Sequence, residues 1–242
     1  MNEESRKRGP RKKKPAAKAE QPEAEKPQAG QAKTEKSGSD ESVKAAVLAA
    51  ALPGAAFDGF SDKLLQAAGK DAGVGKTELA RLFPAGPLSL IEYYSQSVDA
   101  EMEVRLAGLD LPAMKIRARI AAAVTARLSI LKPHKEAARR AAAMLALPMH
   151  AGLAARLLYR SVDAMWRAAG DTATDFNFYT KRGILAGVYG ATLMRWFNDT
   201  SADEAATTEF LAARIENVMQ LEKLKAQAKQ MIASAFAAKP AS

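Results

Sequence analysis

Residues 72–83 read AGVGKTELARLF, a glycine-containing turn followed by a short run with helical spacing of its apolar residues. Two stretches with helix signals precede this run, at 41–52 and 60–70. Short helices that meet at a turn of this kind form a helix-turn-helix. The sequence therefore predicts a three-helix unit over residues 41–86, with its last helix at 75–83.

Helix signals continue beyond this unit, and no segment alternates β-branched residues with a period of two. Alanine, the best helix former, is the commonest residue. Prolines and glycines, beginning with Pro53 and Gly54, mark the expected helix ends. The later helices are expected at 87–107, 113–132, 134–146, 150–169, 175–198 and 203–235. We therefore expect an all-α protein with a larger helical domain at 87–202 and a C-terminal amphipathic helix and tail at 203–242.

The first forty residues have a different composition. They contain no large apolar residue after Met1, so they cannot bury enough surface to offset the entropy of ordering. We expect residues 1–40 to be a disordered basic tail. Its cluster RKRGPRKKK at 6–14 is either a solvated segment or a patch for an anionic membrane or nucleic acid. The rest of the chain is only mildly basic, which disfavours a nucleic-acid partner.

Several familiar metal and nucleophile sites do not fit the sequence. Cysteine is absent, which excludes disulfides and thiolate chemistry. His134 and His150 lack the glutamate three positions earlier that a di-iron bundle site uses, and two histidines make a conventional zinc site improbable. The nucleophile motif Gly-x-Ser-x-Gly does not occur. We therefore expect neither a metal nor another cofactor.

Residues 69–77, GKDAGVGKT, resemble a phosphate-binding loop only in part. Gly69 lies one residue too far from Gly75, the glycine before Lys76, and a helical pattern precedes the loop where a strand is required. The acids Asp163, Asp171 and Asp175 have structural interpretations, as a partner of Arg167 and as helix-boundary residues. The chain is therefore predicted not to be an enzyme.

Residues 160–182, RSVDAMWRAAGDTATDFNFYTKR, mix aromatic and charged side chains at a junction between two expected helices. Such a mixture is typical of a surface that touches a partner. The helix before the junction carries an apolar stripe that includes Leu157, Leu158 and Val162. The stretch is therefore a candidate partner surface as well as a helix junction.

The helix expected at 175–198 contains Gly183, Gly187 and Gly190, with Ala191 beside them. Three glycines inside a helix cost on the order of 3 kcal/mol relative to alanine, so something should offset that cost. Small residues at this spacing let another helix or a bulky apolar ligand approach the backbone closely. Tight helix packing and a ligand cavity are both open at this point.

The C-terminal region repeats apolar residues at helical spacing, among them Leu221, Leu224, Met231 and Ile232. After Glu222 it contains lysines and no further acid, a pattern that suits the surface of an anionic membrane. The alternative is a dimer or core helix with a solvated outer face. No apolar run reaches the ~18 residues that span a bilayer, so we expect a soluble or peripheral protein.

The turn and helix at 72–83 resemble those of TetR-type regulators, in which an Ala-Gly-Val turn leads to a helix ending in an aromatic residue. Such regulators combine a three-helix unit with a longer helical domain. Base and phosphate contacts need several exposed polar and basic side chains. This helix offers only Lys76, Thr77 and Arg81, offset by Glu78. A DNA-binding regulator with a hydrophobic effector pocket is therefore the alternative function, and no nucleic-acid partner is expected.

Residues 154–199, AARLLYRSVDAMWRAAGDTATDFNFYTKRGILAGVYGATLMRWFND, closely resemble the ubiquinone-biosynthesis accessory family of lipid-binding proteins, which have a TetR-like fold. Earlier stretches agree with the same family, and the resemblance covers about residues 44–225. Those stretches are AAFDGFSDKLLQAAGKDAG at 55–73, LFPAGPLSLIEYY at 82–94, MKIRARI at 114–120 and PHKEAARRA at 133–141.

This resemblance implies a homodimer whose helical domain binds an isoprenoid lipid or quinone precursor and presents it to the di-iron demethoxyubiquinone hydroxylase. The implied location is peripheral, at the cytoplasmic face of a bacterial inner membrane or the matrix side of a mitochondrial inner membrane. The expected hydroxylase-binding residues are Asp163, Met165, Asp175, Phe178 and Tyr179. The expected lipid-binding residues are Leu157, Leu158, Val162, Gly187, Val188 and Ala191. The expected membrane-binding residues are Leu221, Leu224, Met231 and Ile232.

Overall fold

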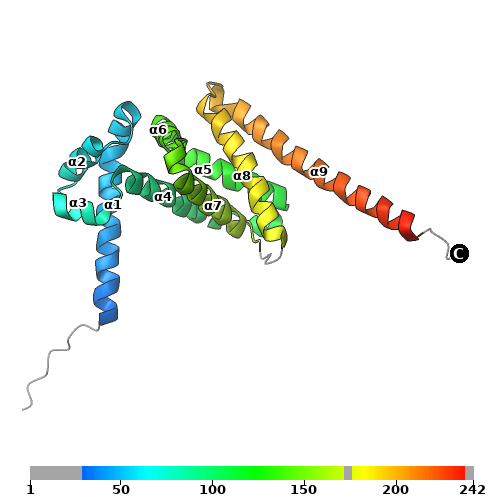
Figure 1. Ribbon diagram of the computed structural model, residues 1–242, viewed down its shortest axis with the longest axis horizontal. Helices are drawn as coiled ribbons and strands as arrows, with labels where there is room; N and C mark the ends of the chain where they lie inside the picture. The colour runs from blue at the N-terminus through cyan, green and yellow to red at the C-terminus, as the bar shows by residue number, and fades with distance from the viewer. Residues whose placement is uncertain (1–28, 172–175, 238–242) are drawn as a thin grey trace, which may run out of the picture. The chain divides into compact units, whose positions relative to one another are not determined.

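The computed structural model describes the backbone of residues 29–171 and 176–237, and the side chains at 39–171, 178–220 and 227 (Figure 1). The chain divides into two units, residues 1–38 and 39–242, and every contact considered below lies in the second. All regular elements in the described residues are helices, which confirms the all-α prediction. Residues 1–28 of the expected disordered tail lie outside the described residues, but residues 29–40 belong to helix α1, so the expected boundary at residue 40 is wrong.

The α-helices are connected by short segments that include four 3₁₀ turns. In chain order the α-helices are α1 (Ala29–Asp58), α2 (Asp62–Asp71), α3 (Lys76–Leu82), α4 (Pro87–Ala107), α5 (Ile116–Leu131), α6 (Lys135–Leu145), α7 (Ala151–Ala168), α8 (Phe176–Phe197) and α9 (Ala205–Ala237). The 3₁₀ turns are Leu111–Ala113, Lys132–His134, Pro148–His150 and Ala202–Glu204.

The first helix corrects one expected boundary. Helix α1 continues through Pro53 to Asp58, so the predicted helix end at Leu52 is wrong. Proline removes one backbone hydrogen bond, but Leu52 is buried and the surrounding packing offsets that loss. Gly54 allows a neighbouring side chain to come close, since a Cβ there would lie 2.6 Å from Leu64 Cδ1. Tertiary packing therefore overrides the local helix-ending signal.

Helices α2 and α3 form the predicted helix-turn-helix. The hydroxyl of Ser61 caps α2 by accepting a hydrogen bond from the backbone N–H of Leu64 at 3.2 Å. Gly73 takes a positive φ of 71° in the turn, a conformation that glycine adopts without strain. Gly69 lets the two helices approach, because a Cβ there would lie 2.7 Å from Leu79 Cδ2. The turn sequence thus specifies this unit directly.

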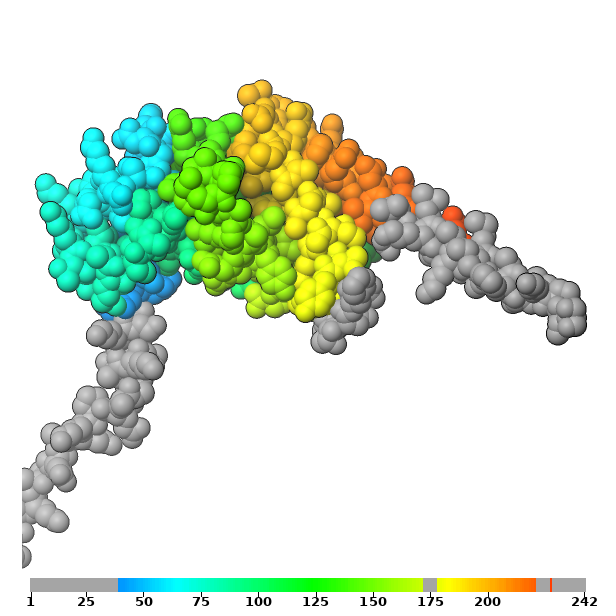
Figure 2. All heavy atoms as spheres, in the orientation of Figure 1, coloured from blue at the N-terminus to red at the C-terminus, as the bar shows by residue number. Residues whose placement is uncertain are grey.

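The remaining helices form the larger domain. Helix α4 packs against α5 and α7, and α8 packs between α7 and α9 (Figure 1). In the space-filling view the surface of α8, in yellow, runs directly into that of the first half of α9, in orange (Figure 2). The most deeply buried side chains of the larger domain include Met102, Val124, Val162, Met165 and Trp196, which are at most 1% exposed. Helix α8 therefore lies where it can contribute to two separate interiors.

Among the described residues, no single helix has both the length and the apolar composition needed to cross a membrane. Two consecutive segments, Ile116–Leu145 and Pro148–Ala168, meet those criteria only when taken together, and they are bent by 93°.

Candidate functional site: two cavities beside helix α8

A cavity of about 420 Å³ lies between helices α4, α5, α6, α7 and α8, and we call it the α4–α8 cavity. Most of its wall consists of alanine and leucine side chains. The apolar members include Leu131, Leu145, Leu157, Leu158 and Leu193. A volume of this size lies within the range of small-molecule sites. The cavity can therefore enclose an apolar group of moderate size.

A buried polar cluster contributes to the same wall. The Arg127 guanidinium donates to Asp99 Oδ1 at 2.7 Å, to Ser95 Oγ at 3.1 Å and to the Tyr189 hydroxyl oxygen. The Ser161 hydroxyl donates to Asp99 Oδ2 at 2.9 Å. All of these residues except Asp99 line the cavity. The ion pair is buried, and its hydrogen bonds satisfy both charges, as a stable buried pair requires.

The buried position of these side chains shifts the pKa values of Arg127, Tyr189 and Tyr94. Burial alone would lower the pKa of Arg127, but the charge and hydrogen bond of the Asp99 carboxylate raise it, and the net pKa lies above its ordinary value, so the guanidinium is charged. Burial also raises the pKa of Tyr189. Tyr94, another wall residue, has a pKa raised to about 12 by burial. Both phenols are therefore neutral hydrogen-bonding groups at pH 7.

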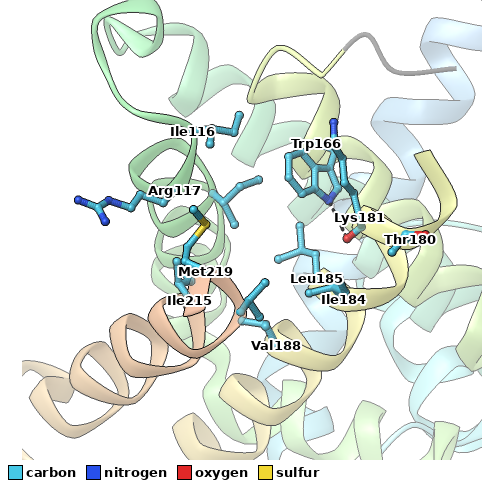
Figure 3. A pocket seen from close by; sticks show the side chains of 12 residues that line it. Ile116, Arg117, Trp166, Thr180, Lys181, Ile184, Leu185, Val188, Ile215 and Met219 are labelled. Atoms are coloured by element: carbon cyan, nitrogen blue, oxygen red, sulfur yellow. Dashed lines mark hydrogen bonds between the residues drawn. The ribbon is translucent and has the colours of Figure 1, made fainter. Parts of the chain in front are cut away.

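A second cavity of about 340 Å³ lies between α5, α7, α8 and α9, and we call it the α9 cavity (Figure 3). Its lining is mostly apolar, with Ile215 and Met219 of α9 facing Leu185 and Trp166 across the space (Figure 3). The Trp166 indole N–H donates to the Lys181 carbonyl at 3.2 Å, which fixes the ring at the wall. The first half of α9 is thus one wall of an apolar cavity.

The predicted lipid-binding residues divide between these interiors. Leu157 and Leu158 line the α4–α8 cavity, and Val188 lines the α9 cavity. Val162 is 1% exposed and lines neither cavity. Gly187 and Ala191 are exposed and also line neither.

The glycines of α8 do not pack tightly against another described helix. A Cβ built at Gly183, Gly187 or Gly190 would meet no described atom within 4 Å. Gly190 lines the α4–α8 cavity, so its missing side chain enlarges that space. Gly183 and Gly187 face outward instead. Two explanations for these glycines were left open, a ligand cavity and tight helix packing. The ligand cavity fits Gly190, and tight packing against another described helix of this chain fits none of the three glycines.

The α7–α8 junction depends on Arg182, which is 3% exposed. Its guanidinium contacts Asp163 Oδ1 at 2.7 Å and Asp171 Oδ2 at 3.1 Å, and donates to the Phe178 carbonyl at 3.2 Å. It also stacks over the Phe178 ring, 3.4 Å from its centroid. Asp163 pairs with Arg167 at 3.1 Å as expected from their spacing. One buried cation therefore ties the two helices together.

The predicted hydroxylase-binding residues have different exposures at this junction. Tyr179 is 68% exposed, and its ring lies 5.1 Å edge-on from the half-buried Phe178. Asp163 is half-buried by its arginine partners. Met165 is fully buried and is a core residue, because it lies on the inner face of α7. Asp175 lies outside the described residues.

The predicted membrane-binding residues lie within α9, whose backbone is helical to Ala237. The side chains of Leu221, Leu224, Met231 and Ile232 are outside the described set.

Helix α3 of the helix-turn-helix presents little unpaired positive charge, while α2 adds the exposed Lys63 and Lys70. Arg81 of α3 is paired with Asp40 and with Glu78, each at 2.6 Å, which leaves Lys76 as the other cation on that helix. No group of three or more metal-ligating side chains occurs in the described part of the chain. His150 contacts the Met144 carbonyl at 2.8 Å through Nδ1.

Sequence reasoning missed the residues Tyr94, Arg127 and Tyr189 of the α4–α8 cavity and the role of Arg182. One signal was present, because Arg127 occupies the same face of α5 as the buried Val124 and Leu131. An arginine at such a position indicates a buried partner. The identity of that partner could not be inferred, since Asp99 lies 28 residues away on another helix.

Comparison with known proteins agrees with this architecture. Residues 151–222 match the COQ9 family model. The ubiquinone biosynthesis protein COQ9, mitochondrial, of Rattus norvegicus is 41% identical over 107 residues, covering 44% of this chain and 34% of that protein. The Homo sapiens protein of the same name is 39% identical over the same length and covers the same shares. The Drosophila melanogaster protein is 29% identical over 154 residues, covering 62% of this chain and 47% of that protein.

The chain spans about a third of the length of the first two relatives. The crystal structure of a TetR transcriptional regulator from Nitrosomonas europaea superposes with a TM-score of 0.57 at 18% identity, covering 72% of this chain and 95% of that one. This likeness shows the fold alone, and it confirms the TetR-like prediction. The resemblance to the ubiquinone-biosynthesis family is likewise confirmed, with a COQ9 domain at residues 151–222.

Proposed function

We propose that this chain, which carries a COQ9 domain at residues 151–222, is a lipid-binding accessory protein of ubiquinone biosynthesis. It takes up an isoprenoid quinone precursor at a membrane and presents it to the demethoxyubiquinone hydroxylase. The observation that carries the proposal is the pair of mostly apolar cavities beside α8, both built in part from that domain. The protein itself performs no chemistry in this proposal.

The energetic argument concerns the isoprenoid tail. Each buried CH₂ group is worth ~0.8 kcal/mol, so a polyprenyl chain does not leave a bilayer unaided. Two apolar cavities of about 340 and 420 Å³ supply a replacement environment for part of such a molecule. Each is large enough for a head group or a tail segment, but neither encloses a long polyprenyl chain. The remainder of the tail stays in the bilayer in this proposal.

Helix α9 connects the cavity with the membrane. Its first half lines the α9 cavity through Ile215, Val218 and Met219, and the proposed membrane residues follow on the same helix. Arg117 of α5 and Glu216 of α9 approach to 3.8 Å, but both are exposed and such pairs contribute little. This ion pair therefore contributes little to holding α9 against α5.

Lipid carriage can be tested directly on the full chain. Organic extraction of purified protein followed by mass spectrometry should recover an isoprenoid quinone or a phospholipid. Flotation with anionic vesicles should carry the protein upward. A variant with Leu221, Leu224, Met231 and Ile232 changed to glutamine should keep its fold and lose flotation. Protein that contains no lipid and does not bind vesicles would contradict the proposal.

A matched control uses the other half of the same helix. Ala212 and Ala213 are exposed on α9 before the predicted membrane segment, and changing both to glutamine should leave flotation unchanged. Loss of flotation in this control as well would show that polarity anywhere on α9 disrupts binding, and that the assigned residues are wrong.

A further inference from the structure

The α4–α8 cavity contains a hydrogen-bonding group that nothing in the described structure satisfies. The Tyr94 hydroxyl is buried and has no hydrogen-bond partner, although the residue lines the cavity. Buried hydroxyls nearly always have a partner, and leaving one without costs stability. The oxygen has almost no solvent-accessible surface, and the side chain that bears it belongs to the cavity wall. A buried hydroxyl without a partner requires an explanation, and a ligand bound in the cavity would supply one.

A second phenol at the cavity has an unused proton. Tyr189 accepts a hydrogen bond from Arg127, and its own proton has no acceptor among the described residues. Of the two serines that line the cavity, Ser161 donates its proton to Asp99, whereas Ser95, like Tyr189, accepts from Arg127. The cavity thus contains two phenol donors that lack acceptors. The missing group is therefore an acceptor.

The charge balance defines that acceptor further. Arg127 is the one charged side chain among the described residues that line the cavity, and Asp99 behind it neutralises it. A carboxylate or phosphate entering here would be an unpaired buried anion, which is strongly unfavourable. A hydroxyl group would bring a further proton that needs its own acceptor. A neutral carbonyl oxygen accepts without donating and adds no charge.

We propose that the polar end of the α4–α8 cavity binds the neutral carbonyl oxygen of an otherwise apolar ligand, with Tyr94 and Tyr189 as the hydrogen-bond donors that select it. This inference rests on the proposed lipid-binding function and adds the chemical class of the ligand's polar end. Two sources share that chemistry, the carbonyl of a quinone ring and the carbonyl of an acyl ester. The apolar wall around Leu157 and Leu158 then holds the adjoining carbon skeleton.

The test measures binding of three probes to the full chain by native mass spectrometry. The probes are a decyl-substituted benzoquinone, the methyl ester of a fatty acid of similar length, and decylbenzene, which has no oxygen. Tyr94→Phe should weaken binding of the quinone roughly fivefold to tenfold and leave decylbenzene unchanged, since one hydrogen bond is lost. If Tyr94→Phe weakens binding of the ester as much as binding of the quinone, the site recognises the carbonyl group itself. If it weakens binding of only one of the two, that probe shows whether a quinone ring or an acyl ester supplies the carbonyl.

A second measurement separates ligand recognition from a structural role. Since the hydroxyl has no partner in the ligand-free protein, Tyr94→Phe should have the same Tm as the wild type or a higher one. The matched control is Tyr93→Phe on the same helix, whose hydroxyl contacts the Glu41 carbonyl at 3.3 Å outside the cavity. This control should leave the binding of all three probes unchanged.

The outcomes are distinguishable. Failure of every probe to bind the wild-type protein would refute the lipid-binding function together with this inference. Binding of all probes with no effect of Tyr94→Phe would refute the carbonyl site and leave lipid binding intact. A Tyr94→Phe protein that unfolds would also refute it, because the hydroxyl would then have a structural partner.

Discussion

Arg182 is the single residue on which the α7–α8 junction depends most. It is 3% exposed and contacts two carboxylates, one of which, on Asp171, has a side chain only 5% exposed. Without Arg182, Asp171 would keep its pair with Lys181 at 2.8 Å and Asp163 its pair with Arg167 at 3.1 Å, so each carboxylate would lose its buried partner and keep an exposed one. Arg167 at the same junction also pairs with Asp163, but it is exposed, so it can be compared with the buried Arg182.

The first prediction is that Arg182→Gln lowers the free energy of unfolding by about 1.5–3 kcal/mol, because buried hydrogen bonds to charged groups are lost while each carboxylate keeps a second cation. Arg167→Gln should change it by less than about 1 kcal/mol, because that side chain is 62% exposed and solvent screens its pairing. Urea unfolding followed by circular dichroism measures both. Similar values for the two variants would show that burial of Arg182 is not what stabilises the junction.

The second prediction concerns Asp199, at the turn before α9. Its carboxylate accepts hydrogen bonds from the Ser201 hydroxyl at 2.6 Å, from the Thr207 hydroxyl at 2.6 Å and from the Thr207 N–H at 2.7 Å. These bonds hold the pKa of Asp199 well below its ordinary value. A group whose pKa is lower in the folded protein contributes stability above its unfolded pKa and loses it as the pH falls.

The wild-type protein should therefore lose this contribution as the pH falls below about 4, the unfolded pKa of aspartate. Asp199→Asn should be less stable at pH 7, and the difference from wild type should shrink in acid. Urea titrations across this pH range provide the measurement. Asp203→Asn, at a residue with a φ of 50° that asparagine tolerates, serves as the control and should retain the wild-type pH profile. A constant difference between wild type and Asp199→Asn would contradict the assignment.

At the scale of elements, α8 has three distinct faces. One side contributes Val188 to the α9 cavity, and another contributes Tyr189 and Gly190 to the α4–α8 cavity. The third face exposes Gly183 and Gly187, with no described atom near either Cβ position. Small residues at this spacing permit a second helix to approach closely. The expected homodimer would explain why these costly glycines lie on an open surface.

The third prediction is that Gly187→Leu weakens self-association, because the added side chain blocks close approach of a second α8. Gly187→Ala alone should stabilise the isolated protomer by up to ~1 kcal/mol, since alanine favours the helix. Gly152→Leu on α7, which also faces open space, is the control for added apolar bulk. Sedimentation equilibrium measures the dimer constant. A dimer equally stable in all variants would place the interface elsewhere.

At the scale of the whole molecule, the proposed hydroxylase surface and the α9 cavity meet at the α7–α8 junction. Trp166 and Lys181 line the α9 cavity, while Tyr179, two residues before Lys181, is exposed to solvent. Phe178 supports the junction from beneath Arg182, so its removal would disturb folding as well as any docking. Tyr179 is therefore the residue at which partner binding can be tested without unfolding the protein.

The fourth prediction is that Tyr179→Ala weakens capture of the demethoxyubiquinone hydroxylase at least tenfold, as expected for an exposed aromatic at the centre of an interface. Tyr159→Ala on α7 is the control, because this tyrosine is 45% exposed and lies outside the junction. A pull-down with a concentration series measures both. Equal capture by wild type and Tyr179→Ala, with intact folding, would refute the docking surface.

Much of the fold was predictable from local sequence. The turn at Gly73, the cap at Ser61 and the spacing of apolar residues each depend on near neighbours, so the helix-turn-helix and most helix positions follow from them. The family resemblance at 154–199 also follows from the sequence. Pro53 is one exception, since packing around Leu52 carries α1 past a local stop signal, and the start of α1 at Ala29, inside the expected tail, is another.

The two cavities beside α8 could not be predicted from the sequence, because they depend on how the helices pack. Helical periodicity places Leu157 and Val188 on apolar faces, but it does not say which helix opposes each face, so the two cavities could not be separated. Met165 shows the same limit. It was predicted to lie on the hydroxylase-binding surface, but it is fully buried in the core, and the local sequence does not show which face of α7 the other helices cover.

The sequence by itself therefore determined the helices, the turn that joins α2 to α3 and the family relationship, because these depend on contacts within a few residues. Tertiary structure decided the meeting of Tyr94, Arg127 and Tyr189 beside an apolar cavity. These residues come from α4, α5 and α8, and only the packing of those helices brings them together. Burial then gives the cluster its chemistry, because an unsatisfied hydroxyl matters only where water cannot reach it.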